Sequence, residues 1–202
     1  MLCPRPKIFR EIPREKAVFN AQCPDMAKSV KCLEEYDMTC TGEEHRRLME
    51  PERYANIISV LSEICEEGST LNEVAISNLK CFNETFSNTS CKLEREDFID
   101  SSWVVVPFKN STGYHSFLPE RIYCIAELRL LACILENITR NCGLRVRDAT
   151  LEFLQRTSFA LDRCPLESRE TLLEDIDTFD LTEGQKSFAI SELERMKISD
   201  EA

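Results

Sequence analysis

Apolar side chains recur every three or four positions over most of the chain, which is the period of one face of an α-helix. The clearest stripe is Tyr54, Ile57, Ile58, Leu61 and Ile64, and Gly68 follows it as a stop. A longer stripe opens at Pro119 and ends at Cys142-Gly143; it consists of Ile122, Ile125, Ala126, Leu130, Ile134, Leu135 and Ile138. These two stripes predict two amphipathic helices.

Shorter stripes predict further helices on either side of these two. They are Met26, Val30, Leu33 and Tyr36; Val146, Ala149, Phe153 and Ala160, closed at Cys164-Pro165; Leu172, Leu173, Ile176 and Phe179; and Phe188, Ile190 and Leu193. Thr70 with Glu73 forms a predicted capping box for a helix running toward Cys81 and Phe82, and Thr182 with Gln185 forms another. Residues 98–118, with Trp103-Val104-Val105-Val106 and Pro107, predict a short strand or an extended loop. The chain has only five glycines, which also favours an all-α protein.

The eleven cysteines indicate disulfide chemistry rather than a metal site. The two closest cysteines are eight positions apart, and only His45 and His115 could add imidazole ligands, so zinc and C-x-x-C redox motifs are not indicated. We therefore expect no metal and no cofactor. With Cys3 set aside as a free or intermolecular thiol, or as part of a non-native segment, ten cysteines could close five bridges: Cys23, Cys32, Cys40, Cys65, Cys81, Cys91, Cys124, Cys133, Cys142 and Cys164.

Helix geometry restricts how these cysteines can pair. Helical positions nine apart point to opposite sides and lie about 13 Å apart along the axis, so Cys124 cannot bridge Cys133, nor Cys23 bridge Cys32. Each cysteine-bearing helix must then be tied to neighbours on two sides. The spacing suggests Cys40–Cys65 and Cys142–Cys164, each closing a hairpin, and Cys32–Cys81 as a third pair; the other partners stay open.

The cysteine spacings also repeat. Intervals of 9, 8 and 25 positions from Cys23 to Cys65 match intervals of 9, 9 and 22 from Cys124 to Cys164. We interpret this as two duplicated helical-hairpin units in a disulfide-crosslinked stack of short helices. The predicted divisions are a basic, disordered or non-native segment 1–22, a first unit 23–97, a connector 98–118, a second unit 119–165 and an acidic helical tail 166–202.

Four N-x-[ST] sequons predict glycosylation in a secretory compartment: Asn83, Asn88, Asn110 and Asn137. They agree with the cysteine framework, which needs oxidising conditions, and together they predict a secreted, extracellular protein. Residues 1–20 contain no apolar stretch of signal-peptide length, so a missing first exon or a non-native N-terminus is expected. The chain contains no run of about 18 apolar residues, so the sequence predicts no transmembrane segment.

The net charge and the absence of catalytic motifs argue against nucleic-acid binding and enzymatic activity. The net charge is −11, which disfavours nucleic acid as a partner. We find no P-loop, no G-x-S-x-G and no H-E-x-x-H, and neither histidine lies in a catalytic pattern, so we expect no enzymatic activity. The cysteine spacings of insect odorant-binding proteins and of saposin-like domains are also absent.

The run Cys23-x8-Cys32-Leu33-x2-Tyr36-x3-Cys40, then Ile64-Cys65-x2-Gly68-Ser69, Cys81-Phe82 and Cys91, resembles a family of uncharacterised secreted cysteine-rich proteins of arthropods. More distantly, it is similar to the cysteine-rich domain of unknown function that is abundant in nematodes. The resemblance covers about residues 20–165. It implies an all-helical, disulfide-rich extracellular fold and assigns no functional residue.

Two hypotheses about function follow. The first is a secreted glycosylated protein that binds another extracellular protein, with the connector around Trp103 and Phe108 as its apolar patch. The alternative is an extracellular carrier of a small apolar ligand or lipid, which a cavity lined by Ile122, Ile125 and Leu135 would support. Leu and Ile at helical spacing are more often plain core, which is the interpretation that we favour for these stripes. The partner and the oligomeric state are left open.

Overall fold

A computed structural model describes residues 3, 12–40, 49–107, 114–117, 119–160 and 163–200, without the side chains of 40, 104–107, 114–117 and 197–200. The chain divides into two compact units. The first comprises residues 1–88 and 137–159, and the second comprises residues 89–136 and 160–202.

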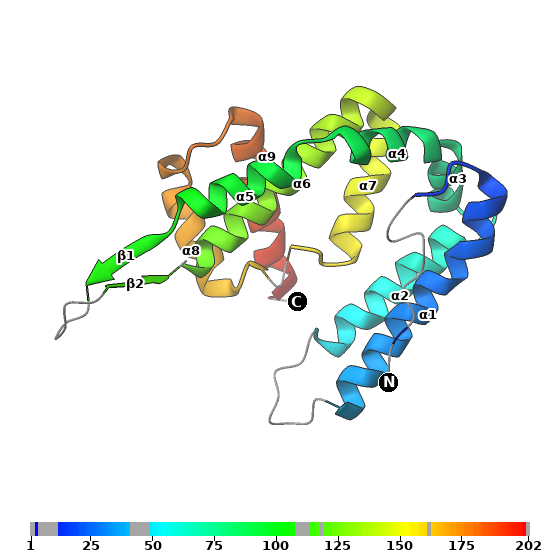
Figure 1. Cartoon of the computed structure of the whole chain (residues 1–202), viewed down its shortest axis with the longest axis horizontal. Helices are drawn as coiled ribbons and strands as arrows, with labels where there is room; N and C mark the ends of the chain where they lie inside the picture. Colours follow the sequence, from blue (N-terminus) through cyan, green and yellow to red (C-terminus); the bar gives the residue numbers. More distant parts are fainter. Residues whose placement is uncertain are drawn as a thin grey trace. The chain divides into compact units, whose positions relative to one another are not determined.

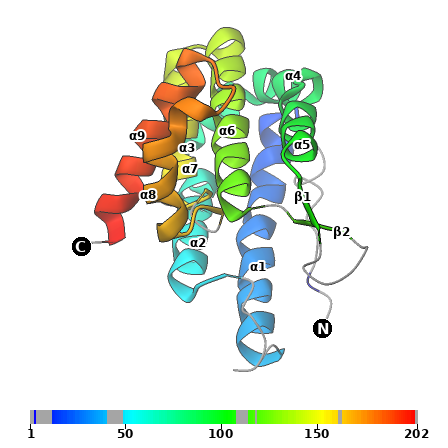
Figure 2. The same cartoon turned by 90° about the vertical axis from the view of Figure 1, so that its left-hand side faces the viewer.

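The first unit is made of helices. They are α1 (Lys16–Cys40), α2 (Pro51–Cys65), α3 (Thr70–Ser77), α4 (Leu79–Asn88), the end of α6 (Glu120–Cys142) and α7 (Leu144–Arg156). Helices α1 and α2 lie side by side and run antiparallel (Figures 1 and 2). The predicted helix over Tyr54–Ile64 is α2, and it ends at Cys65, three residues before Gly68, whose φ is +92°.

The second unit holds most of α6 and the C-terminal helices. It contains α5 (Cys91–Ser101), the strands β1 (Val104–Pro107) and β2 (Tyr114–Phe117), α8 (Leu166–Asp175), the 3-10 turn η3 (Ile176–Thr178) and α9 (Glu183–Asp200). The two strands pair antiparallel, with Val104 opposite Phe117 and Pro107 opposite Tyr114 (Figure 1). The all-α class is confirmed, because these two short strands are the only sheet in the described part of the chain.

Two local predictions at helix starts have different outcomes. Thr182 and Gln185 form the predicted capping box: the Thr182 backbone N–H donates to the Gln185 side chain at 3.1 Å, and the Gln185 N–H donates to the Thr182 hydroxyl at 3.2 Å. The box at Thr70 and Glu73 is wrong by one position. Ser69 is the N-cap, and its hydroxyl accepts from the Asn72 N–H at 3.0 Å.

The segment that follows Ser69 also differs from the prediction. The expected single helix toward Cys81 is divided at Asn78 into α3 and α4. The Asn78 side chain donates back to the Val74 carbonyl at 2.8 Å. Such local hydrogen bonds from a side chain to the backbone compete with the backbone hydrogen bonds of a helix, which agrees with a break at this residue.

The N-terminal segment needs two corrections. Helix α1 begins at Lys16, so residues 16–22 are helical rather than disordered. Cys3, which we had set aside, forms a disulfide with Cys32. The physical reason for the helix is the apolar stripe itself, which extends N-terminally to the buried residues Phe19 and Cys23.

The five described disulfides correct the spacing-based pairs. They are Cys3–Cys32, Cys23–Cys65, Cys81–Cys142, Cys91–Cys133 and Cys124–Cys164. These bridges show that three predicted pairs are wrong, namely Cys40–Cys65, Cys142–Cys164 and Cys32–Cys81. The five bridges use every cysteine except Cys40, whose side chain is not among those that the structure describes. The geometric argument is confirmed: Cys124, Cys133 and Cys142 all lie on α6 and bond to three different segments.

The core of the second unit forms around α6. Ile125, Leu128, Leu172 and Leu193 are fully buried. Glu127 is only 6% exposed, and it accepts from the Arg95 guanidinium of α5 at 3.1 Å. This pair neutralises a buried charge that would otherwise be costly.

The core of the first unit includes one buried polar pair. The Tyr54 hydroxyl donates to Asp37 Oδ2 at 3.3 Å, and the Met49 N–H donates to the same oxygen at 3.4 Å. Burial, and then the negative charge of Asp37, raise the pKa of Tyr54 from its ordinary value of 10.0 to about 12. The folded chain therefore holds the phenol proton more tightly than the unfolded chain does.

A pH dependence of stability follows from this raised pKa. The contribution of Tyr54 is complete below pH 10 and is lost as the pH rises from about 10 to about 12. Between pH 9 and pH 11 the free energy of unfolding of the wild type should fall by about 1.4 kcal/mol more than that of Tyr54→Phe. Urea denaturation of both proteins at each pH measures the difference. Equal losses in the two proteins would show that Tyr54 is not responsible.

Candidate ligand-binding pocket

The first unit contains a pocket of about 330 Å³. This volume is within the range of small-molecule sites in proteins. Thirteen of its fourteen lining residues are apolar, and they come from α1, α2, α3, α4, α7 and the residue Ile12: Ile12, Phe19, Met26, Leu61, Ile64, Leu71, Val74, Ala75, Leu79, Phe82, Phe86, Ala149, Thr150 and Phe153.

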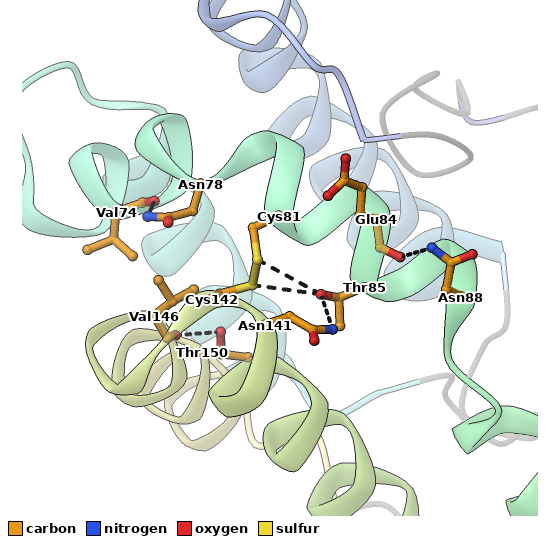
Figure 3. The surroundings of a disulfide bond; sticks show 10 residues. All are labelled: Val74, Asn78, Cys81, Glu84, Thr85, Asn88, Asn141, Cys142, Val146 and Thr150. Carbon is orange, nitrogen blue, oxygen red and sulfur yellow. Dashed lines mark hydrogen bonds between the residues drawn. A yellow bond between two sulfur atoms is a disulfide. The ribbon is translucent and has the colours of Figure 1, made fainter.

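The one polar lining residue already has a hydrogen-bond partner. The Thr150 hydroxyl donates to the Val146 carbonyl at 2.8 Å within α7 (Figure 3). The lining carries no ionisable side chain. A charged group inside the pocket would lose its hydration without gaining a partner, so the pocket chemistry favours hydrocarbon and aromatic groups.

Two phenylalanines of α4 belong to the lining, and one of them, Phe86, is exposed. The rings of Phe82 and Phe86 lie four positions apart with centroids separated by 6.3 Å and planes inclined by 13°. Phe86 is 42% exposed, whereas Leu71 is 4% exposed. Exposed aromatic surface is costly in water, and a ligand seated against Phe86 would cover part of it.

Disulfides join the helices that form the pocket walls. Cys23–Cys65 ties α1 to α2, and Cys23 is fully buried between the lining residues Phe19 and Met26 on α1. Cys81–Cys142 ties α4 to the end of α6 (Figure 3). The Thr85 hydroxyl lies 4.0 Å from the Cys81 sulfur and 3.7 Å from the Cys142 sulfur, and it accepts from the Asn141 amide at 3.1 Å.

The pocket does not involve the apolar stripe of α6. A cavity lined by Ile122, Ile125 and Leu135 would have supported the carrier hypothesis, but these side chains are buried in the second unit at 8%, 0% and 4% exposure and line no part of this pocket. They belong to an ordinary core. A buried apolar stripe on a helix has the same pattern whether it faces a filled core or a cavity, so the pattern alone does not locate a cavity.

The predicted glycosylation sites lie in different environments. Asn88 is exposed at the end of α4, Asn137 is half-buried on α6, and Asn110 lies outside the described residues. Asn83 is only 8% exposed, and its amide donates to the Ile12 carbonyl at 2.8 Å. Glycosylation itself stays a prediction.

The connector predicted as a protein-binding patch is described only in part. Trp103 follows α5 and is 46% exposed. Phe108 lies outside the described residues. The prediction that this segment binds another protein therefore stays open.

The described helices contain no stretch that is both long and apolar enough to cross a membrane. Comparison with known proteins gives no match: neither a protein-family model, nor a curated protein, nor a solved structure is significantly similar to the chain. The resemblance to secreted cysteine-rich proteins of arthropods and nematodes consequently stays a prediction, and the function is argued from the pocket.

Proposed function

We propose that the chain is an extracellular carrier that holds a small, uncharged apolar ligand in the pocket of the first unit. The observation that supports this most directly is the lining of the pocket, which is apolar at thirteen of fourteen residues. The proposal favours the second of the two functions that the sequence suggested, because the apolar pocket is a defined site within the described residues.

The chemistry of the lining defines the ligand class. Each buried methylene of a ligand contributes about 0.8 kcal/mol, so affinity would come from contact area. No side chain of the lining offers a free hydrogen bond to a ligand carboxylate or amine. Any polar group of the ligand would therefore remain at the exposed side near Phe86, in water.

The disulfides and the sequons support an extracellular location for the protein. Five described disulfides form in an oxidising compartment and are rare in the cytosol. The four sequons agree with a secretory route. A rigid, crosslinked pocket also suits a carrier, since preformed sites lose less entropy when a ligand binds.

Native mass spectrometry of the protein secreted by insect cells tests the proposal. We expect a fraction of the protein to carry an apolar compound that organic extraction removes. Extracted protein should then bind N-phenyl-1-naphthylamine, an uncharged fluorescent probe, with a stoichiometry of one. Absence of both co-purified compound and probe binding would contradict the proposed function.

A further inference from the structure

We propose that Asn83 positions the pocket wall and is not a glycan acceptor, and that Asn88 is the sequon of α4 that carries the glycan. The inference deepens the proposed function, because it names a residue that shapes the same pocket. Both asparagines lie on α4, five positions apart, and both belong to an N-x-[ST] sequon.

The first observation is the bond that Asn83 makes. Its Nδ2 donates to the Ile12 carbonyl at 2.8 Å, across 71 residues of sequence. Ile12 lines the pocket and does not lie on a helix, so no helical ladder fixes its backbone. The hydrogen bond from the Asn83 amide ties this lining residue to α4.

The second observation is the environment of the sequon. Asn83 is 8% exposed, and Thr85, the hydroxyl residue of the same sequon, is 3% exposed. Thr85 lies against the Cys81–Cys142 disulfide and accepts from the Asn141 amide (Figure 3). Both polar groups that define this sequon are thus used inside the fold.

A glycan at Asn83 would conflict with this arrangement. N-linked sugar is attached to the asparagine Nδ2 and is bulky and hydrated, so it requires a surface site. At Asn83 that atom is the donor to Ile12. The glycosylated amide would keep one N–H, but Asn83 is only 8% exposed, so the sugar could reach solvent only if the neighbouring Ile12 segment moved and the pocket wall opened.

Asn88 has no such conflict. It is exposed at the last position of α4, and its amide donates to the Glu84 carbonyl at 2.7 Å within the same helix (Figure 3). Ser90, which completes its sequon, is also exposed. A glycan on Asn88 would leave the Asn83–Ile12 contact intact.

Two measurements on the full chain, secreted by insect cells, test the inference. Glycopeptide mass spectrometry should find sugar on Asn88 in most molecules and on Asn83 in few. In addition, Asn83→Ala should bind N-phenyl-1-naphthylamine about 3- to 10-fold more weakly than the wild type, the usual range for one hydrogen bond. The matched control is Asn88→Ala, which removes the other sequon and an exposed amide and should leave probe affinity unchanged.

A double-mutant cycle separates a positioning role from general destabilisation. Ile12→Ala removes the side chain through which Asn83 acts, so Asn83→Ala should have little further effect on probe affinity in that background. Equal effects in both backgrounds, or sugar on Asn83 as often as on Asn88, would overturn the inference. If the wild type binds no probe, the proposed function and the positioning role both fail, whereas sugar on Asn83 alone would leave the proposed function standing.

Discussion

Replacing Cys23 and Cys65 together by Ala should lower the free energy of unfolding by about 4 kcal/mol. The bridge closes a loop with a sequence separation of 42, and its loss restores the corresponding chain entropy to the unfolded state. Cys23 is also fully buried. Urea denaturation of the double variant and the wild type measures the change, which is large beside a typical total stability of about 5–15 kcal/mol.

The control for this prediction is Cys40→Ala. The five described disulfides use all ten other cysteines, so this substitution breaks none of them. We expect its effect to stay within about 1 kcal/mol. A loss for Cys40→Ala as large as that of the double variant would instead support the Cys40–Cys65 pair that spacing alone suggested.

Filling the pocket should abolish most of its ligand binding. Ala75 on α3 is half-buried and lines the pocket, so Ala75→Phe places an aromatic ring inside the space that a ligand would use. We expect at least about a tenfold loss of affinity for N-phenyl-1-naphthylamine, and a stability cost of about 1–3 kcal/mol if the ring overpacks the site. Fluorescence titration and urea denaturation measure the two effects.

Ala55→Phe is the matched control for the filled pocket. Ala55 is exposed on α2, a helix that also contributes to the lining, but Ala55 itself does not line the pocket. This variant should bind the probe like the wild type. If Ala75→Phe binds the probe as tightly as Ala55→Phe does, the probe does not occupy this pocket.

The positions of the main helices were predictable because the apolar period is a local property. The stripe ending at Ile64 became α2, and the stripe from Ile122 to Ile138 became α6. Helix ends were predictable where a proline or glycine determines them, as at Gly143, whose φ is +89°. The break at Asn78 was missed because an asparagine within an apolar stripe does not by itself stop a helix.

The disulfide pairs were not predictable from loop length, because a bridge depends on which helix faces meet. Cys23 lies on the same stripe as Phe19, Met26 and Val30, and this stripe packs against α2, which ends at Cys65. That shared stripe was the signal that could have indicated Cys23–Cys65. Loop length instead favoured neighbouring cysteines in the sequence.

The observed connectivity bears on the proposed duplication. In each run of four cysteines the first bonds to the fourth, as Cys23–Cys65 and Cys124–Cys164. The second cysteine of each run bonds to a cysteine that precedes the run, as Cys3–Cys32 and Cys91–Cys133. The third cysteines differ, because Cys142 bonds to Cys81 whereas Cys40 takes part in none of the five described bridges, so the duplication stays a hypothesis.

The pocket could not be predicted from the sequence, because its walls come from five helices and Ile12. Phe82, Phe86 and Phe153 have the same spacing as ordinary core residues. Whether apolar side chains fill the space between helices depends on how the helices cross, and no local pattern determines that.

Methyl NMR of the full chain during a titration with decane tests the central claim most directly. We expect chemical-shift changes in the methyl groups of the lining residues Leu61, Leu71 and Val74, and none in Leu128, Leu172 and Leu193 of the second unit. Unchanged lining resonances at saturating decane, or changes confined to the second unit, would contradict the assignment of this pocket as a site for apolar ligands.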